Sequence, residues 1–236
     1  VWDPSIGFEE KMRAKLTRLW PTLASLGLAP LASMDNLAFS DSLEAACEGA
    51  FLVQESAPEN LELKRSLHAQ IDAAAAPETI IASSSSGLLP SEIQTATQHP
   101  ERMLIGHPFN PVYLLPLVEL VGGEQTATQT IETAKAFYAS LGMQPLVVRK
   151  GIEGYLSDRL QEALWREALH LVNDDVATTA ELDAAIIYGP GLRWAFMGTC
   201  LPFHLAGGES GMRHMLEQFG PALKLPWTKL QAPELT

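Results

Sequence analysis

The sequence predicts an α/β fold in which a doubly wound, mostly parallel sheet is followed by a small all-helical domain. Two features of the chain predict this fold class. Up to Lys150, short apolar runs alternate with amphipathic stretches, and from Gly151 onward no further strand pattern occurs. The runs have the length and the aliphatic content of buried strands, and they cover residues 50–54, 79–83, 103–107, 117–121 and 144–149.

The stretches between the runs predict helices that pack on the sheet. Residues 58–75 place Leu61, Leu63, Leu67 and Ile71 on one side of a helix, and residues 126–141 form a second such stretch that Gly142 is expected to end. Because strands and helices alternate along the chain, we expect most neighbouring strands to be parallel.

The second half of the chain predicts helices alone. Apolar residues recur at helical spacing over residues 155–172, 182–187 and 211–219. Thr178 and Glu181 have the spacing of a capping box at the start of the middle helix, and Gly189-Pro190-Gly191 is expected to end it. The pattern therefore divides the chain into two domains, residues 1–150 and 151–236.

The first residues have the pattern of the end of a strand. Val1-Trp2-Asp3-Pro4 places an acid after two apolar residues, and a helix is expected directly afterwards. A compact α/β domain does not begin in this way, and no G-x-G-x-x-G motif occurs in the chain. We therefore expect either an unusual fold or a sheet whose first strand, Gly-rich loop and helix lie outside this chain.

The charge balance argues against several classes of protein. The 236 residues include 16 Lys and Arg against 28 Asp and Glu, a net charge of −12 that repels nucleic acids and anionic lipids. No apolar run approaches the roughly 20 residues of a membrane helix, and no signal-peptide pattern occurs. The two cysteines, Cys47 and Cys200, lack metal-ligand spacing and fit a reducing, cytoplasmic location. We expect a small-molecule partner, and neither nucleic acid, membrane nor metal.

Two candidate ligand contacts lie where strands are predicted to end. Asp3 is placed to accept hydrogen bonds from ribose hydroxyl groups and to repel a 2′-phosphate; its alternative role is a helix cap. The four serines at positions 83–86 follow a predicted strand, at the edge where open α/β sheets bind ligands. Their alternative role is a turn that leads into a helix near Pro90.

His107 and Glu119 form the strongest candidate for catalysis. His107 ends a predicted strand between prolines that stiffen its loop. Glu119 follows inside an apolar run, where an unpaired carboxylate would be costly. A His–Glu pair would satisfy the carboxylate, fix the imidazole and leave the other ring nitrogen as a general base. The alternative is a structural histidine and a glutamate on a solvated edge.

Six motifs occur in an order and spacing that is specific as a set. They are Asp3-Pro4, Gln54-Glu55 with Pro58-Glu59-Asn60-Leu61, Ala82-Ser83-Ser84-Ser85-Ser86, His107-Pro108-Phe109-Asn110-Pro111, Leu117-Val118-Glu119 and Gly154-Tyr155-Leu156-Ser157-Asp158-Arg159-Leu160. The set resembles the 3-hydroxyacyl-CoA dehydrogenase family, whose opening strand and Gly-rich loop are missing here. The resemblance implies a Rossmann-type NAD-binding domain over residues 1–150 and a helical domain for dimerisation and substrate binding over residues 151–236.

The resemblance also implies roles for single residues. His107 would be the general base, Glu119 its orienting partner and Ser86 the serine that bonds the substrate hydroxyl. NAD would be contacted by Asp3, Glu55, Ser84 and Asn110, and the substrate by Ser86, Asn110 and Asp158. The family motif G-F-x-x-N-R has an asparagine where Asp158 stands, and the extra negative charge disfavours an acyl-CoA substrate.

Motifs of the second half narrow the resemblance to the L-carnitine dehydrogenase branch of the family. They include Leu164-Trp165-Arg166-Glu167-Ala168, Gly191-Leu192-Arg193-Trp194-Ala195 and Pro226-Trp227-Thr228-Lys229-Leu230. Carnitine is a 3-hydroxy acid with a trimethylammonium group, which carboxylates and aromatic faces bind. The resemblance implies an NAD-dependent homodimer that oxidises L-carnitine to 3-dehydrocarnitine. The alternatives are a dehydrogenase of gulonate or 3-hydroxybutyryl-CoA, or a non-catalytic relative similar to a lens crystallin.

Overall fold

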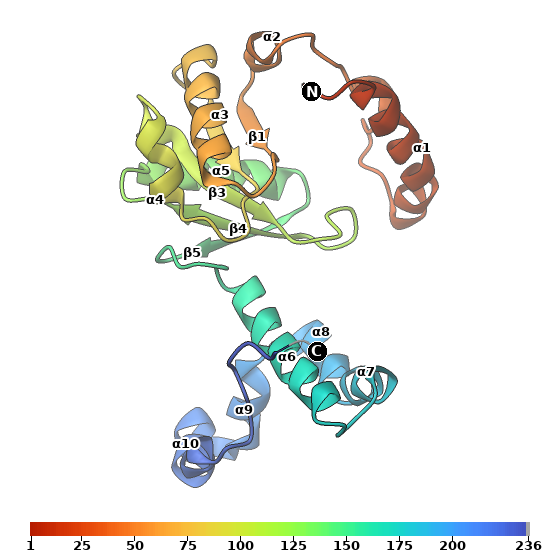
Figure 1. The fold of residues 1–236 in the computed structure, drawn as a ribbon, viewed down its shortest axis with the longest axis vertical. Coiled ribbons are helices and arrows are strands. Elements are labelled where there is room, and N and C mark those ends of the chain that lie inside the picture. Colours follow the sequence, from red (N-terminus) through yellow and green to blue (C-terminus); the bar gives the residue numbers. More distant parts are fainter. Residues whose placement is uncertain (235–236) are drawn as a thin grey trace. The chain divides into compact units, whose positions relative to one another are not determined.

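The computed structural model describes residues 1–234, which fall into two compact units (Figure 1). The first unit ends at Asp158, and the second begins at Arg159. The first unit holds the sheet, and the second consists of helices and their connections. No helix in the described part of the chain is long and apolar enough to cross a membrane.

The first unit is built around five strands that pair in chain order. They are β1 (Leu52–Glu55), β2 (Ile80–Ser83), β3 (Met103–Pro108), β4 (Leu117–Gly122) and β5 (Gln144–Val148). Each corresponds to a predicted apolar run, so the predicted α/β fold class is confirmed. All neighbours are parallel except β3 and β4, which are antiparallel. Residues 109–116 between these two strands are too few for a crossover helix, so β4 returns directly alongside β3.

Alternation of side chains along the strands gives the sheet two buried faces. On one face, α5 (Thr128–Ser140) contributes Ala134 and Tyr138, and the strands contribute Ile80, Ala82, Leu104, Val118 and Leu120. The opposite face carries Ile81, Met103, Ile105 and Val121. It is covered by α2 (Leu43–Cys47), α3 (Leu61–Ala74) and α4 (Pro90–Ile93). Helices therefore cover both faces, as a doubly wound sheet requires (Figure 1).

The predicted helix boundaries of this unit follow from local signals. The Asn60 side chain accepts a hydrogen bond from the Leu63 amide at 2.9 Å and so caps α3. Gly142 has a φ of +81°, and this left-handed conformation, which glycine adopts without steric cost, follows the end of α5. Both helices lie within the stretches that the apolar spacing predicted.

The strand end predicted at residues 1–4 is wrong. The Val1 amino group donates to the Ala38 carbonyl at 2.8 Å, and the Val1 carbonyl accepts from the Ser40 amide at 2.9 Å. These two bonds make no strand, because a strand needs a continuous row of paired peptide groups. The helix expected directly afterwards is present as α1 (Phe8–Leu26).

The second unit continues from α6 (Ser157–Asn173). Its further helices are α7 (Thr179–Ile187), α8 (Pro190–Met197), α9 (Cys200–Ala206) and α10 (Gly211–Phe219). Thr178 and Glu181 form the predicted capping box of α7. The sequence did not predict α8, because Gly189-Pro190-Gly191 indicates a helix end; Pro190 also begins α8, where its missing N–H has no helical partner to lose. Short 3₁₀ turns cover Met34–Asn36, Gln94–Ala96, Pro100–Arg102, Gly208–Ser210 and Gly220–Lys224.

A buried ionic cluster fixes the end of β1 to α3. The Glu55 carboxylate accepts hydrogen bonds from Lys64 Nζ at 2.9 Å and from His68 Nε2 at 3.0 Å. It also accepts one from the Ser83 hydroxyl at 2.6 Å, and all four side chains are buried. Burial alone would raise the pKa of Glu55, but these hydrogen bonds and the Lys64 charge outweigh it and lower the pKa from 4.5 to about 2.

We expect Glu55→Gln to destabilise the protein by about 3–5 kcal/mol at neutral pH, because it removes the nearer counter-charge of the buried Lys64 ammonium group and leaves it only the Glu59 carboxylate, at 3.8 Å. The pH dependence should also change. A carboxyl group with a lowered pKa in the folded state adds stability above its unfolded pKa of 4.5, and this stability is lost as the pH falls toward 2. Urea unfolding from neutral pH down to about pH 3 measures both effects.

The matched control is Glu62→Gln, at an exposed position on α3, the helix that carries Lys64. It should change the free energy of unfolding by less than about 1 kcal/mol. Equal stabilities for the two variants at neutral pH would contradict the structural role of the Glu55 cluster.

Candidate active site

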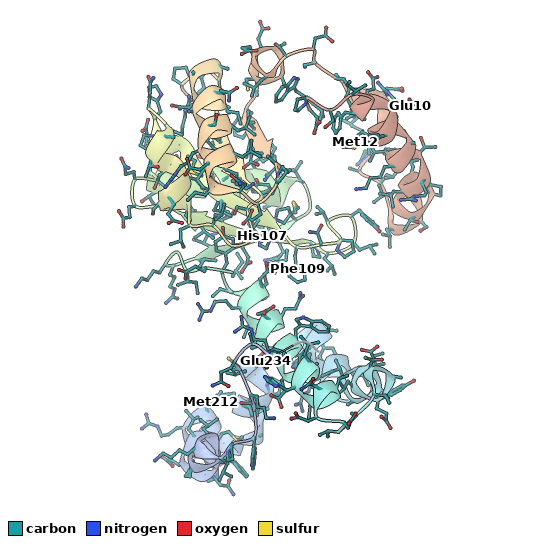
Figure 2. The ribbon with its side chains drawn as sticks, viewed as in Figure 1. Glu10, Met12, His107, Phe109, Met212 and Glu234 are labelled. Carbon is teal, nitrogen blue, oxygen red and sulfur yellow. The ribbon has the colours of Figure 1, made fainter. Side chains whose placement is uncertain are left out.

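His107 and Glu119 face each other across the antiparallel strands β3 and β4. Their Cα atoms are register partners, so both side chains emerge on the same face of the sheet. His107 Nδ1 lies 3.2 Å from Glu119 Oε2; His107 is buried and Glu119 is 0% exposed. The structure thus brings together the pair that the sequence singled out. His107 lies close to the end of β3 (Figure 2).

The buried Glu119 carboxylate is held by the chain that leads into α6. Its Oε1 accepts hydrogen bonds from the Leu156 and Ser157 amides, both at 3.0 Å, and its Oε2 accepts one from the Ser157 hydroxyl at 2.5 Å. Burial by itself would raise the pKa of Glu119. The hydrogen bonds from His107, Ser157 and Leu156 outweigh burial and hold the pKa below its ordinary value, so the group is a carboxylate at neutral pH.

The charge of Glu119 determines where the proton lies on His107. An ionised carboxylate only accepts hydrogen bonds, so His107 Nδ1 is the donor to Glu119. A neutral imidazole then has its lone pair at Nε2, which lies 3.1 Å from Ser86 Oγ and accepts a hydrogen bond from it. The result is an oriented ring with a basic nitrogen beside a hydroxyl group, an arrangement suited to taking a proton from an alcohol.

The loop that carries Ser86 is shaped by a residue to which the sequence assigned no role. Glu59 Oε1 accepts hydrogen bonds from the Ser85 hydroxyl at 2.6 Å and from the Gly87 amide at 2.8 Å. The Ser86 and Leu88 amides donate to the same oxygen, each at 3.2 Å. Glu59 therefore organises the run of serines as a carboxylate-centred loop. In the sequence, Glu59 belongs to the motif Pro58-Glu59-Asn60-Leu61, directly before Asn60, the cap of α3, and that motif did not indicate a role in the serine loop.

Tyr155 and Asp158 complete the surroundings of the imidazole. Tyr155 is fully buried, its ring meets that of His107 edge-on at 5.5 Å, and its hydroxyl donates to the Leu88 carbonyl at 2.8 Å. It has a φ of +45°, a left-handed conformation that is rare for a bulky side chain and that clusters at functional sites. Asp158 Oδ2 lies 3.8 Å from His107 Nε2, on the side where a substrate hydroxyl would bind.

The parallel strands end at an edge that presents polar groups. Gln54 Nε2 donates to Ser84 Oγ at 2.7 Å and to the Gly106 carbonyl at 3.0 Å, which ties together the ends of β1, β2 and β3. Ser56 and Ser84 place their hydroxyl oxygens 2.9 Å apart at the same edge. Open α/β sheets bind dinucleotides outside the carboxyl ends of their strands, and this set of hydroxyl and amide groups fits such a polar cofactor.

The remaining predicted site residues, Asp3, Asn110 and Glu55, have different surroundings. Asp3 is exposed, and its Oδ1 accepts a hydrogen bond from the Ser5 amide at 2.7 Å in the turn before α1, whose N-cap is Gly7. Asn110 is exposed in the loop after β3. Glu55 is buried in its ionic cluster, so any contribution of Glu55 to cofactor binding is indirect, through the strand end that it fixes.

Comparison with known proteins matches both parts of the chain. Residues 2–151 match the 3-hydroxyacyl-CoA dehydrogenase NAD binding domain, and residues 154–235 match the C-terminal domain of the same family. An L-carnitine dehydrogenase of Pseudomonas putida is 61% identical over 236 residues, covering 100% of this chain and 74% of the relative. One of Oceanobacillus iheyensis is 58% identical over 234 residues, with 99% of this chain and 76% of the relative covered.

Solved structures agree with this assignment. A 5-formyl-3-hydroxy-2-methylpyridine 4-carboxylic acid 5-dehydrogenase, described as an NAD⁺-dependent dismutase, has a TM-score of 0.87 and 31% identity over 99% of this chain and 74% of its own. The (S)-3-hydroxybutyryl-CoA dehydrogenase of Ralstonia eutropha shares the fold, with a TM-score of 0.69 and 24% identity over 93% of this chain and 77% of its own. The predicted family and the predicted cofactor are therefore confirmed: the chain belongs to the 3-hydroxyacyl-CoA dehydrogenase family of NAD-dependent enzymes.

Proposed function

We propose that this protein oxidises L-carnitine to 3-dehydrocarnitine with NAD. The observation that carries the proposal is the Asp158 carboxylate, whose Oδ2 lies 3.8 Å from His107 Nε2. A substrate hydroxyl that reaches Nε2 brings its neighbouring groups beside this carboxylate. In L-carnitine, one methylene separates the carbinol carbon from the trimethylammonium group and another separates it from the carboxylate, and the negative charge of Asp158 favours the cation on its side. The relatives named L-carnitine dehydrogenase support the same substrate.

In this mechanism the chain's own residues handle the hydroxyl proton. Ser86 Oγ donates a hydrogen bond to the substrate oxygen, and His107 Nε2 accepts the hydroxyl proton. Glu119 stabilises the resulting imidazolium through Nδ1. The chemistry that NAD would supply when bound is acceptance of the hydride from C3, which turns the carbinol into a ketone. Because His107 must be neutral to act, oxidation should be favoured on the alkaline side.

The cofactor contacts are part of the proposal. The exposed Asp3 carboxylate would accept hydrogen bonds from ribose hydroxyl groups, and Ser84 and Asn110 would contact the cofactor at the ends of β2 and β3. Asn110 and Ser86 would also contact the substrate. The cytoplasmic location expected from the cysteine content and the division into a cofactor domain and a helical domain remain proposals of the same kind.

The substrate is tested by following nicotinamide absorbance with L-carnitine, gulonate and 3-hydroxybutyryl-CoA in turn. We expect turnover with L-carnitine. Asp158→Asn should raise the KM for L-carnitine by roughly tenfold or more, because it removes the charge that faces the cation. Asp183→Asn, at an exposed position on α7, is the control and should leave KM unchanged. Exclusive turnover of the CoA ester would reject L-carnitine as the substrate, and no turnover at all would favour a non-catalytic relative.

The assignment of the base is tested by His107→Gln, which keeps a hydrogen-bonding side chain but cannot take the proton. We expect turnover to fall by at least roughly 10²-fold, with NAD binding nearly unchanged. Glu119→Gln should also be severely impaired, and the double variant should be little worse than either single one, because the two residues act as a unit. His214→Gln, on the exposed surface of α10, serves as the control. A His107→Gln enzyme with most of its turnover would require another base.

The second unit supports the proposal of a homodimer. The helices α6 to α9 bury no side chain fully, and they leave Trp165 57% exposed, Tyr188 80% and Phe196 71%. Large apolar side chains exposed in this number mark a protein–protein interface. Light scattering should give twice the mass of the monomer, and Tyr188→Glu should weaken the association. A monomer mass for the unaltered protein would contradict the dimer.

A further inference from the structure

We propose that Ser157 is a positioning residue that sets how strongly Glu119 attracts the proton of His107. Ser157 Oγ donates to Glu119 Oε2 at 2.5 Å, and this is the same oxygen that accepts from His107 Nδ1 at 3.2 Å. Of the two hydrogen bonds to Oε2, the one from Ser157 is the shorter. The inference rests on the proposed role of His107 as the base and adds a control on its strength.

The geometry makes the Ser157 hydroxyl separable from the rest of the Glu119 site. The backbone amides of Leu156 and Ser157 already hold Oε1, each at 3.0 Å, and they remain whatever side chain occupies position 157. Glu119 is 0% exposed, so bulk water does not reach its carboxylate. Removing the hydroxyl therefore leaves the carboxylate in place and changes only the number of donors on Oε2, from two to one.

The physical consequence follows from competition between the two donors. A hydrogen bond to a carboxylate stabilises its charge and reduces its attraction for other protons. While the Ser157 hydroxyl donates a hydrogen bond to Glu119 Oε2, the Glu119 carboxylate attracts the Nδ1 proton of His107 less strongly, and the imidazolium is stabilised less. Without the hydroxyl, Glu119 should hold Nδ1–H more tightly, and the ring should stay protonated to higher pH.

The remaining ionisable groups around His107 are unchanged by a substitution at position 157. Asp158 Oδ2 lies 3.8 Å from Nε2, and the Tyr155 ring packs edge-on against the imidazole. The Glu59 carboxylate faces the backbone of the Ser86 loop rather than the imidazole itself. A change in the titration of His107 in a Ser157 variant is therefore attributable to the lost donor.

The test is the NMR titration of the His107 ring nitrogens in the free protein, compared with Ser157→Ala. We expect the midpoint of the titration to move upward by roughly half a unit to one unit. The acid limb of the pH profile of kcat/KM for oxidation should move in the same direction. Ser157→Cys, with a thiol that is a weaker donor of similar size, should give a smaller shift. Ser157→Thr, which keeps the hydroxyl, should restore the original midpoint.

The matched control is Ser42→Ala, which removes a serine hydroxyl from the start of α2, where it accepts from the Ala45 amide at 3.1 Å. That variant should lose some stability and leave the His107 midpoint unmoved. The inference would be overturned if Ser157→Ala folds and leaves the midpoint of the His107 titration unchanged. It would also be overturned if Ser157→Cys leaves that midpoint unchanged. If the midpoint moves and L-carnitine is not oxidised, the substrate proposal fails and the role of Ser157 stands.

Discussion

The buried carboxylate of Glu119 is the constraint on which the site depends. A charge inside a sheet is tolerated only when its oxygens are engaged by donors, because unpaired burial costs several kcal/mol. The donors to Glu119 come from His107 on β3 and from Leu156 and Ser157 at the start of α6. Satisfying one charge therefore fixes the imidazole, the pairing of β3 with β4 and the entry into α6 at the same time.

The Glu59 carboxylate holds the loop that carries Ser86, as the Glu119 carboxylate holds the His107 imidazole. Glu59 gathers the donors of the loop that carries Ser86, and its other oxygen lies 3.8 Å from Lys64 Nζ. Lys64 is also bonded to Glu55, so one buried ammonium group links the two glutamates at the start of α3. The Ser86 hydroxyl and the His107 imidazole, which would both contact the substrate hydroxyl, are thus held by two different carboxylates, those of Glu59 and Glu119.

Chemistry and substrate selection are assigned to different parts of the chain. The proposed base, His107, and its partner Glu119 lie on paired strands, where the register sets their separation, as a proton transfer requires. The residue proposed to select the substrate, Asp158, lies in the first turn of α6. A second carboxylate beside the same imidazole favours a substrate with a cationic group and opposes one with phosphates. In the proposed function, Asp158 therefore selects the substrate without any change to the strands that carry His107 and Glu119.

The sequence by itself determined the five strands, several of the helices and the pairing of His107 with Glu119. The five strands, the capping box at Thr178 and Glu181 and the helix that Gly142 follows depend on neighbours in the chain, so local patterns reveal them. His107 and Glu119 were predictable as partners because a carboxylate in an apolar run needs a partner wherever the chain folds. The local pattern failed at residues 1–4, because forming a strand depends on a paired neighbour and not on apolar residues alone.

Only the tertiary structure decided how that pair is held. The donors from Leu156 and Ser157 come from 37 and 38 residues beyond Glu119, and those to Glu59 come from 26 to 29 residues beyond it. Glu59, Tyr155 and Ser157 lie in motifs that indicated the family, but those motifs assign them no contact with the serine loop, His107 or Glu119. Their roles arise where a helix start or a loop packs against a strand end, and contacts between distant segments are fixed by packing and by the need to satisfy buried charge.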